Sequence, residues 1–180
     1  VAFALYKAGY DIHTIEYVGG GRAYYWFNRL TDYRFGSTMT KDDIPIIYHD
    51  PDINIRSTTK GPLNGPIEDF TWDQISTYVR LIHGEMIPKL EEALTFVIDS
   101  TDLRAVWLDM KGDANAMKAV IPIQQKAMKR VMQKKRPLEI WIGLPTEQVI
   151  NEFLAYPDYV NIISLCELDL DDVRKTNARV

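Results

Sequence analysis

Three stretches of strand length in this sequence carry acidic or basic side chains at or near their ends. These side chains are Glu16, the pair His49 and Asp50, and the pair Asp109 and Lys111. Because buried strands of α/β proteins place their chemistry on the loops that follow them, we expect these groups to converge. Carboxylates bind hard cations such as Mg²⁺ and Ca²⁺, histidine transfers protons, and lysine can hold a phosphate oxygen. The residue types therefore indicate acid–base chemistry on a phosphate ester beside a divalent cation.

The amino-acid composition limits the classes of protein to which this chain can belong. The 180 residues are 46% hydrophobic and 26% charged, with a formal net charge of -4, which is typical of a soluble globular domain. Basic residues are not gathered on aromatic-rich segments, so nucleic-acid binding has no electrostatic support. The basic run 126–136 is expected to be a solvated helix end. The single cysteine, Cys166, excludes an internal disulfide, and no apolar run of about 18 residues predicts a transmembrane segment.

The first residues of the sequence have the pattern of a helix that is already ending. Residues 2–9 resemble the last turns of a helix closed by Gly9, and no initiator methionine or signal sequence precedes them. We therefore expect the N-terminus of the domain to be missing. The compartment, whether cytoplasmic or secreted, stays open.

Strand and helix patterns alternate along the rest of the chain. Apolar runs predict strands at 11–18, 44–48, 103–110, 138–144 and 160–166. Helical spacing predicts helices at 71–83, 89–98, 115–134 and 146–154, with Pro88 in the first turn of the second and a fraying helix or tail from Asp171. An aromatic-rich insertion at about 19–39 separates the first two strands and has no assigned structure.

This alternation predicts a parallel sheet with right-handed crossovers, in an α/β fold. Two architectures fit: an open doubly wound sheet and an incomplete TIM (β/α)8 barrel. No glycine-rich nucleotide-binding motif opens a strand-to-helix turn, which favours the barrel. Because a barrel usually needs about 250 residues, we predict one barrel domain over residues 1–180, truncated at both ends, with five or six strands visible.

Five stretches, in order, resemble the glycerophosphodiester phosphodiesterase family. They are 8–11 (AGYD), 40–50 (TKDDIPIIYHD), 56–69 (beginning RSTT), 87–94 (IPKLEEAL) and 106–111 (VWLDMK). The resemblance implies a TIM barrel that uses a divalent metal and two histidines to hydrolyse glycerophosphodiesters to an alcohol and glycerol phosphate. His49 matches the second histidine, which protonates the leaving group in the family. The family's first histidine belongs to a His-Arg-Gly motif on the first strand, which the resemblance would put upstream of Val1.

The resemblance also assigns site residues. Arg56 matches the family's Arg-Thr-Thr continuation and is expected to bind substrate together with Lys111. Glu16 is the candidate for either member of the family's Glu-x-Asp metal pair, and Asp32 resembles the aspartate of the stretch that follows that pair. Asp109 replaces a third metal-binding glutamate. The expected cofactor is Mg²⁺ or Ca²⁺, held by Glu16 with Asp32 or Asp109.

These residues are compatible with three functions. The first is hydrolysis of a glycerophosphodiester, a reaction of lipid metabolism. The second is the related sphingomyelinase or lysophospholipase D-like branch, which acts on a lysolipid and which the Asp109-x-Lys111 form resembles. The third is an inactive barrel that binds a phosphorylated ligand or a partner protein, because the Glu-x-Asp pair is irregular.

Overall fold

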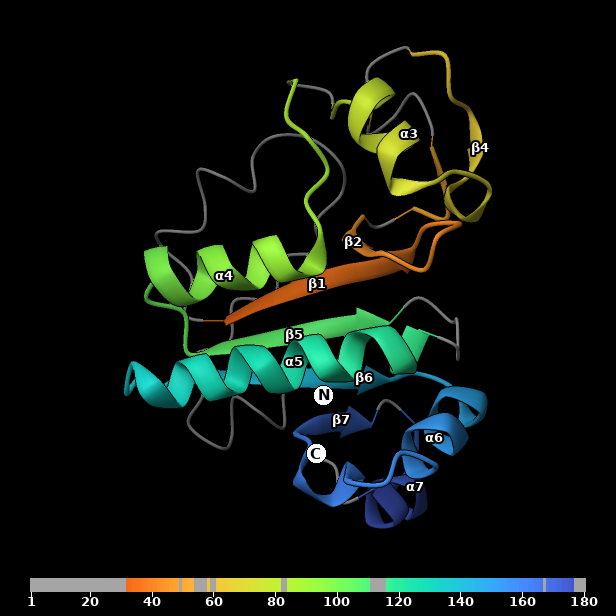
Figure 1. Cartoon of the computed structure of the whole chain (residues 1–180). Helices are drawn as coiled ribbons and strands as arrows, with labels where there is room; N and C mark the ends of the chain where they lie inside the picture. Colours follow the sequence, from red (N-terminus) through yellow and green to blue (C-terminus); the bar gives the residue numbers. More distant parts are fainter. Residues whose placement is uncertain are drawn as a thin grey trace.

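A computed structural model describes residues 32–48, 50–53, 58, 61–81, 84–110, 116–166 and 168–176, apart from the side chains of 32–37 and 170. At the centre of this part of the chain is a five-stranded sheet with the order β2-β1-β5-β6-β7 (Figure 1). Its strands are β1 (Asp32–Met39), β2 (Pro45–Ile47), β5 (Ala105–Met110), β6 (Glu139–Leu144) and β7 (Ser164–Cys166). The helix expected at 2–9 and the strand expected at 11–18 lie outside the described residues.

Four of these strands are parallel and one is not. β1 pairs in parallel with β5, β5 with β6, and β6 with β7, whereas β2 is antiparallel to β1. The prediction of a parallel sheet is therefore wrong for β2. The tight turn at Lys41-Asp42-Asp43 reverses the chain directly after β1, and Asp43 accommodates it with a φ of 58°.

The strand β1 comes from a stretch to which the sequence assigned no structure. The last eight residues of the insertion expected at about 19–39 form β1, which lies between β2 and β5 in the sheet. Residues 19–31 lie outside the described part of the chain.

The helices are α3 (Trp72–Tyr78), α4 (Leu90–Ser100), α5 (Ala116–Gln133), α6 (Glu147–Leu154) and α7 (Leu170–Thr176), with short 3-10 helices η1 (Ile67–Asp69) and η2 (Tyr159–Asn161). The predicted helices at 89–98, 115–134 and 146–154 are confirmed. The strand predicted at 160–166 begins only at Ser164, because η2 occupies its first residues. No helix in the described ranges is long and apolar enough to cross a membrane.

Two helix ends differ from the prediction. The capping box of Thr71 and Gln74 starts α3 as expected, but the helix ends at Tyr78 rather than at residue 83. The Arg80 guanidinium donates to the carbonyls of Ser76 and Val79, at 2.8 and 2.7 Å. It thereby supplies hydrogen-bond donors to carbonyl groups at the end of the helix. Pro88 precedes α4 rather than lying in its first turn, because Lys89 is the N-cap residue.

The main hydrophobic core lies between the sheet and the helices α4, α5 and α6 (Figure 1). Strand alternation divides β5 between two faces. Val106 and Leu108 pack into this helix-covered core, whereas Ala105 packs with Trp141 of β6 and Leu165 of β7 on the other face. The sheet thus has one face closed by helices and one face that carries a separate, smaller apolar cluster.

The basic run 126–136 at the end of α5 is solvated, as expected, because the side chains of Lys126 and Lys134 are 77% and 44% exposed. Its side chains form ion pairs with α4: Lys126 with Glu91 at 2.6 Å, Lys134 with Asp99 at 2.6 Å, and Arg130 with the same Asp99. Just beyond α5, Arg136 donates to carbonyls at the end of α4 and after it. This run therefore fixes α5 to α4, although each exposed pair contributes little alone.

A second, smaller core is formed by residues 48–88, which we call the lobe, together with Ile46 of β2. The lobe contains α3, η1 and a two-stranded sheet of β3 (Asp52–Ile53) and β4 (Gly65–Pro66), packed around Ile53, Ile67 and Ile75. Its two ends lie side by side, because the Ile47 amide donates to the Pro88 carbonyl at 2.9 Å. The lobe is therefore an insertion between β2 and α4, and it lies beyond the carboxyl end of β1 (Figure 1).

Candidate active site

The carboxyl ends of the four parallel strands form one edge of the sheet. Active sites of α/β proteins lie at this edge, where the loops that follow the strands converge. Of the last two residues in β1, β5, β6 and β7, Asp109 is the one that carries a carboxylate. The structure therefore places Asp109 at the edge that the sequence predicted for the site.

Asp109 is deeply buried, with 3% of its surface exposed. It lies opposite Gly36 of β1 and, by strand alternation, on the face shared with Ala105 and Trp107. Because burying a carboxylate is costly without compensating donors or a cation, this position suits a group with a chemical or structural partner. Its role as a metal ligand stays a prediction.

Asp32 does not lie near Asp109. Asp32 begins β1 opposite Ala105, whereas Asp109 is opposite Gly36, four residues farther along the strand. At the rise of a β-strand this offset is roughly 13 Å, so the two residues lie toward opposite edges of the sheet. The structure therefore does not bring Asp32 and Asp109 together around one ion.

The strand that precedes His49 reaches the same edge in an unexpected way. The prediction that β2 ends there because it is parallel to its neighbours is wrong. However, β2 is so short that its last residue, Ile47, pairs with Ser37, which in turn pairs with Met110. The chain thus leaves β2 at the level of Met110, the residue after Asp109, two strands and about 9.6 Å away from β5.

The remaining predicted site residues, Glu16, His49, Arg56 and Lys111, lie outside the described residues. Within the described ranges, no group of three or more histidine, cysteine or acidic side chains could hold a metal ion. Mg²⁺ and Ca²⁺ take six or more oxygen ligands, several of them from carboxylates or water. Asp109 alone, the one expected ligand described at this edge, does not form such a site.

Asp42 connects the turn after β1 to the lobe, a role that no local sequence pattern indicates. Its Oδ1 accepts hydrogen bonds from the Thr40 hydroxyl at 2.7 Å and from the backbone amide of Trp72 at 2.8 Å. Partial burial raises the pKa of Asp42, but these hydrogen bonds and the Lys89 charge outweigh it and hold the pKa below its usual value. Lys89 also lies over the Trp72 ring, 5.1 Å from its centroid. This corner fixes the start of α3 against the edge of the sheet.

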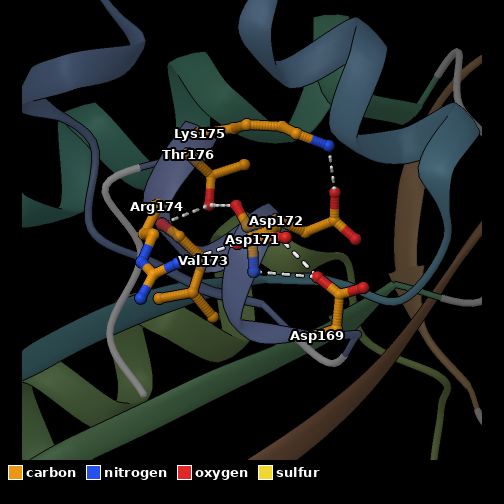
Figure 2. A network of polar contacts seen from close by, with 7 residues as sticks. All are labelled: Asp169, Asp171, Asp172, Val173, Arg174, Lys175 and Thr176. Carbon is orange, nitrogen blue, oxygen red and sulfur yellow. Dashed lines mark hydrogen bonds and ion pairs between the residues drawn. The ribbon is translucent and has the colours of Figure 1, made fainter.

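A second polar network follows β7, in and before α7 (Figure 2). The Asp169 carboxylate accepts from the backbone amides of Asp171 and Asp172 at 2.9 and 3.0 Å, and these bonds lower its pKa, that from Asp172 most. Asp172 pairs with Lys175 at 2.9 Å and raises the pKa of that lysine. The acceptors are thus used to cap and brace the helix, so the network is structural.

The chain matches a known protein family over most of its length. A model of the glycerophosphoryl diester phosphodiesterase family matches residues 38–164, which is more than half of the 180 residues. The chain belongs to this family. The matched range contains His49, Arg56, Asp109 and Lys111, and it leaves out Glu16 and Asp32.

Solved structures with similar folds include two glycerophosphodiester phosphodiesterases. The protein from Parabacteroides distasonis has a TM-score of 0.59 and 17% identity, over 83% of this chain and 58% of that one. The protein from Agrobacterium tumefaciens has a TM-score of 0.55 and 14% identity, over 79% and 56%. At these identities the similarity shows the fold alone. No curated protein matches this chain.

The fold of this family member is therefore α/β, of the TIM-barrel type of its structural relatives. The described residues form part of such a barrel, and their five-stranded sheet is not closed. The chain spans less than two thirds of the length of either relative.

Proposed function

We propose that this family member hydrolyses a glycerophosphodiester to an alcohol and glycerol phosphate. The observation that carries the proposal is the level at which β2 ends. The pairing of Ile47 with Ser37, and of Ser37 with Met110, puts the last residue of β2 at the level of the edge that holds Asp109. Both His49 and Asp109 lie within the range that matches the family.

In this proposal each group has one task. His49 protonates the oxygen of the leaving alcohol, which a group titrating near neutral pH can do efficiently. Lys111 and Arg56 bind non-bridging oxygens of the phosphate, with the guanidinium able to donate two parallel hydrogen bonds. Asp109 contributes a carboxyl group at the edge of the sheet.

We extend the proposal to a divalent cation, Mg²⁺ or Ca²⁺, held by Asp109 with Glu16. When bound, such an ion would neutralise charge on the phosphate. Asp32 is left out of the ligand set, because the register places it near the opposite edge of the sheet. Of these two ligands, Asp109 is the one whose side chain the structure describes. Measurement of cation binding therefore tests this part of the proposal.

The test of the proposed function is hydrolysis of glycerophosphocholine by the full chain, followed as release of glycerol phosphate. We expect His49→Ala to lower kcat by about 10²- to 10⁴-fold, the usual contribution of a general acid. His83→Ala is the matched control, because His83 lies in none of the stretches that resemble the family, and it should leave kcat unchanged. Equal rates for the wild-type protein and His49→Ala would refute the assignment of His49.

The lysophospholipase D-like branch is the second candidate, because an aspartate, Asp109, occupies the acidic position at the end of β5. This branch predicts a cyclic phosphate product from a lysolipid and no turnover of glycerophosphocholine. Phosphorus NMR of the products distinguishes the two reactions. A linear glycerol phosphate product would exclude this branch.

A further inference from the structure

The segment that joins β2 to β3 carries His49, and the structure fixes both of its flanks. Before it, the Ile47 amide donates to the Pro88 carbonyl at 2.9 Å, so β2 is held from the side opposite β1. After it, β3 pairs with β4, and the Ile67 amide donates to the Pro51 carbonyl at 2.9 Å. The ends of this short segment are therefore anchored to different parts of the fold.

Tyr48 links the two flanks directly. Its ring is 2% exposed and packs in the core of the lobe, in the same cluster as Ile53 and Ile67. Its hydroxyl donates to the carbonyl of Asp52 at 3.3 Å, four residues farther along the chain. This bond joins the residue before His49 to the first residue of β3.

We propose that Tyr48 is a positioning residue for His49, an inference that rests on the proposed function. Proton transfer requires the donor to lie within hydrogen-bond reach of the leaving oxygen, and displacements of about 1 Å can lower a rate about 100-fold. The apolar ring of Tyr48 anchors the start of the segment in the core, and its hydroxyl sets the length of the span to Asp52. Tyr48→Phe keeps the ring and removes the link.

The first test compares Tyr48→Phe with Tyr78→Phe, which alters a tyrosine that is 53% exposed at the end of α3. Loss of the hydrogen bond should lower kcat about fivefold with KM within about twofold of wild type. The melting temperature should fall by no more than about 3 °C, because the ring still fills its place in the core. Tyr78→Phe should match the wild type in all three quantities. A Tyr48→Phe enzyme with unchanged kcat would overturn the proposal.

The second test asks whether Tyr48 acts through His49. In a His49→Ala background, adding Tyr48→Phe should not lower the residual rate further, because the group that it positions is gone. A fivefold loss in both backgrounds would overturn the proposal and show a general structural effect. If wild type and His49→Ala hydrolyse substrate at the same rate, the proposed function fails and this inference fails with it. If His49→Ala is slower than the wild type but Tyr48→Phe is not, the proposed function stands and only the positioning role of Tyr48 is refuted.

Discussion

Asp109 and Asp32 have the same side chain but different positions on neighbouring strands. Asp109 lies near the carboxyl end of β5, buried and opposite Gly36, whereas Asp32 lies at the start of β1. Because metal ligands must converge within a few ångströms, only one of these carboxylates can belong to a site at the carboxyl edge. Their separation of roughly 13 Å along the strands makes the two roles experimentally distinct.

We predict that Asp109→Asn weakens the affinity for Mg²⁺ or Ca²⁺ by about 10-fold or more, because it removes a ligand charge. Asp32→Asn, the matched control, should leave the affinity unchanged. Isothermal titration calorimetry of the full chain with each cation measures both. Equal weakening by the two substitutions would contradict the register-based assignment, and an absence of binding in the wild type would remove the cation from the proposal.

How far the site could be predicted depends on how local each signal is. The position of Asp109 near the carboxyl end of β5 was predicted correctly, because a carboxylate that ends a long apolar run is visible in a few residues of sequence, whereas its role as a metal ligand stays a prediction. The position of Asp32 at the start of β1 was not predicted, because the register between two strands is set by pairing, which no single segment encodes. The role of Asp42 was missed because its partner, the Trp72 amide, is 30 residues away and on the backbone.

At the scale of elements, the turn after β1 and the helix α3 depend on each other. Asp42 accepts from the Trp72 amide at the start of α3, and the Lys41 amide donates to the Phe70 carbonyl at 2.9 Å. An acidic group near a helix N-terminus is also favoured by the helix dipole. The ionised form of Asp42 therefore helps to hold the lobe on the sheet.

We predict that Asp42→Asn lowers the melting temperature at pH 7 by about 2 °C, a small effect because the carboxyl is largely exposed. Since folding lowers the pKa of Asp42, its contribution is present above the unfolded pKa of about 3.9 and is lost as the pH falls through the folded value. The difference between wild type and variant should therefore shrink at pH 3. Asp43→Asn is the control, because asparagine also tolerates the positive φ of Asp43. A difference that persists undiminished at pH 3 would contradict this role.

Elements with a continuous local pattern were predicted to within a few residues, and elements defined by pairing were not. The apolar spacing of α4 and the capping box of Thr71 and Gln74 gave the starts of two helices. The strand β1 was missed, although Tyr33 and Phe35 alternate with polar residues, because Gly36 and Ser37 weaken the pattern. The predicted direction of β2 was wrong, because the alternation of helices and strands along the sequence does not reveal a hairpin formed by a tight turn.

At the scale of the whole molecule, the described residues contain a main core, the smaller core of the lobe, and a small apolar cluster on the other face of the sheet. The main core lies between the sheet and three helices, whereas the core of the lobe is closed by two-residue strands and the seven-residue helix α3. Small units with few buried contacts open more often than central strands. The lobe should therefore be the less stable part.

We predict that amide hydrogen exchange is slowest in β5 and β6, which are central in the sheet and buried. Exchange in β4 and α3 should be faster by at least about 10-fold, because opening the lobe leaves the sheet intact. Hydrogen-exchange mass spectrometry on peptides that cover these elements measures the difference. Equal protection in the two regions would show that lobe and sheet unfold together.

The paired ends of the lobe have a consequence for how this chain can change in evolution. The bridge between Ile46 and Lys89 and the bond between Ile47 and Pro88 keep the start and finish of residues 48–88 at a constant separation. The sheet therefore does not depend on how many residues lie between those ends, and lengthening a closed loop costs only about 0.6 kcal/mol per doubling. Insertions, deletions and exchanges beyond β3 can accumulate while β2, β1 and α4 keep their register. Differences in length among family members should concentrate there, so that one part of the protein diversifies while the barrel is conserved.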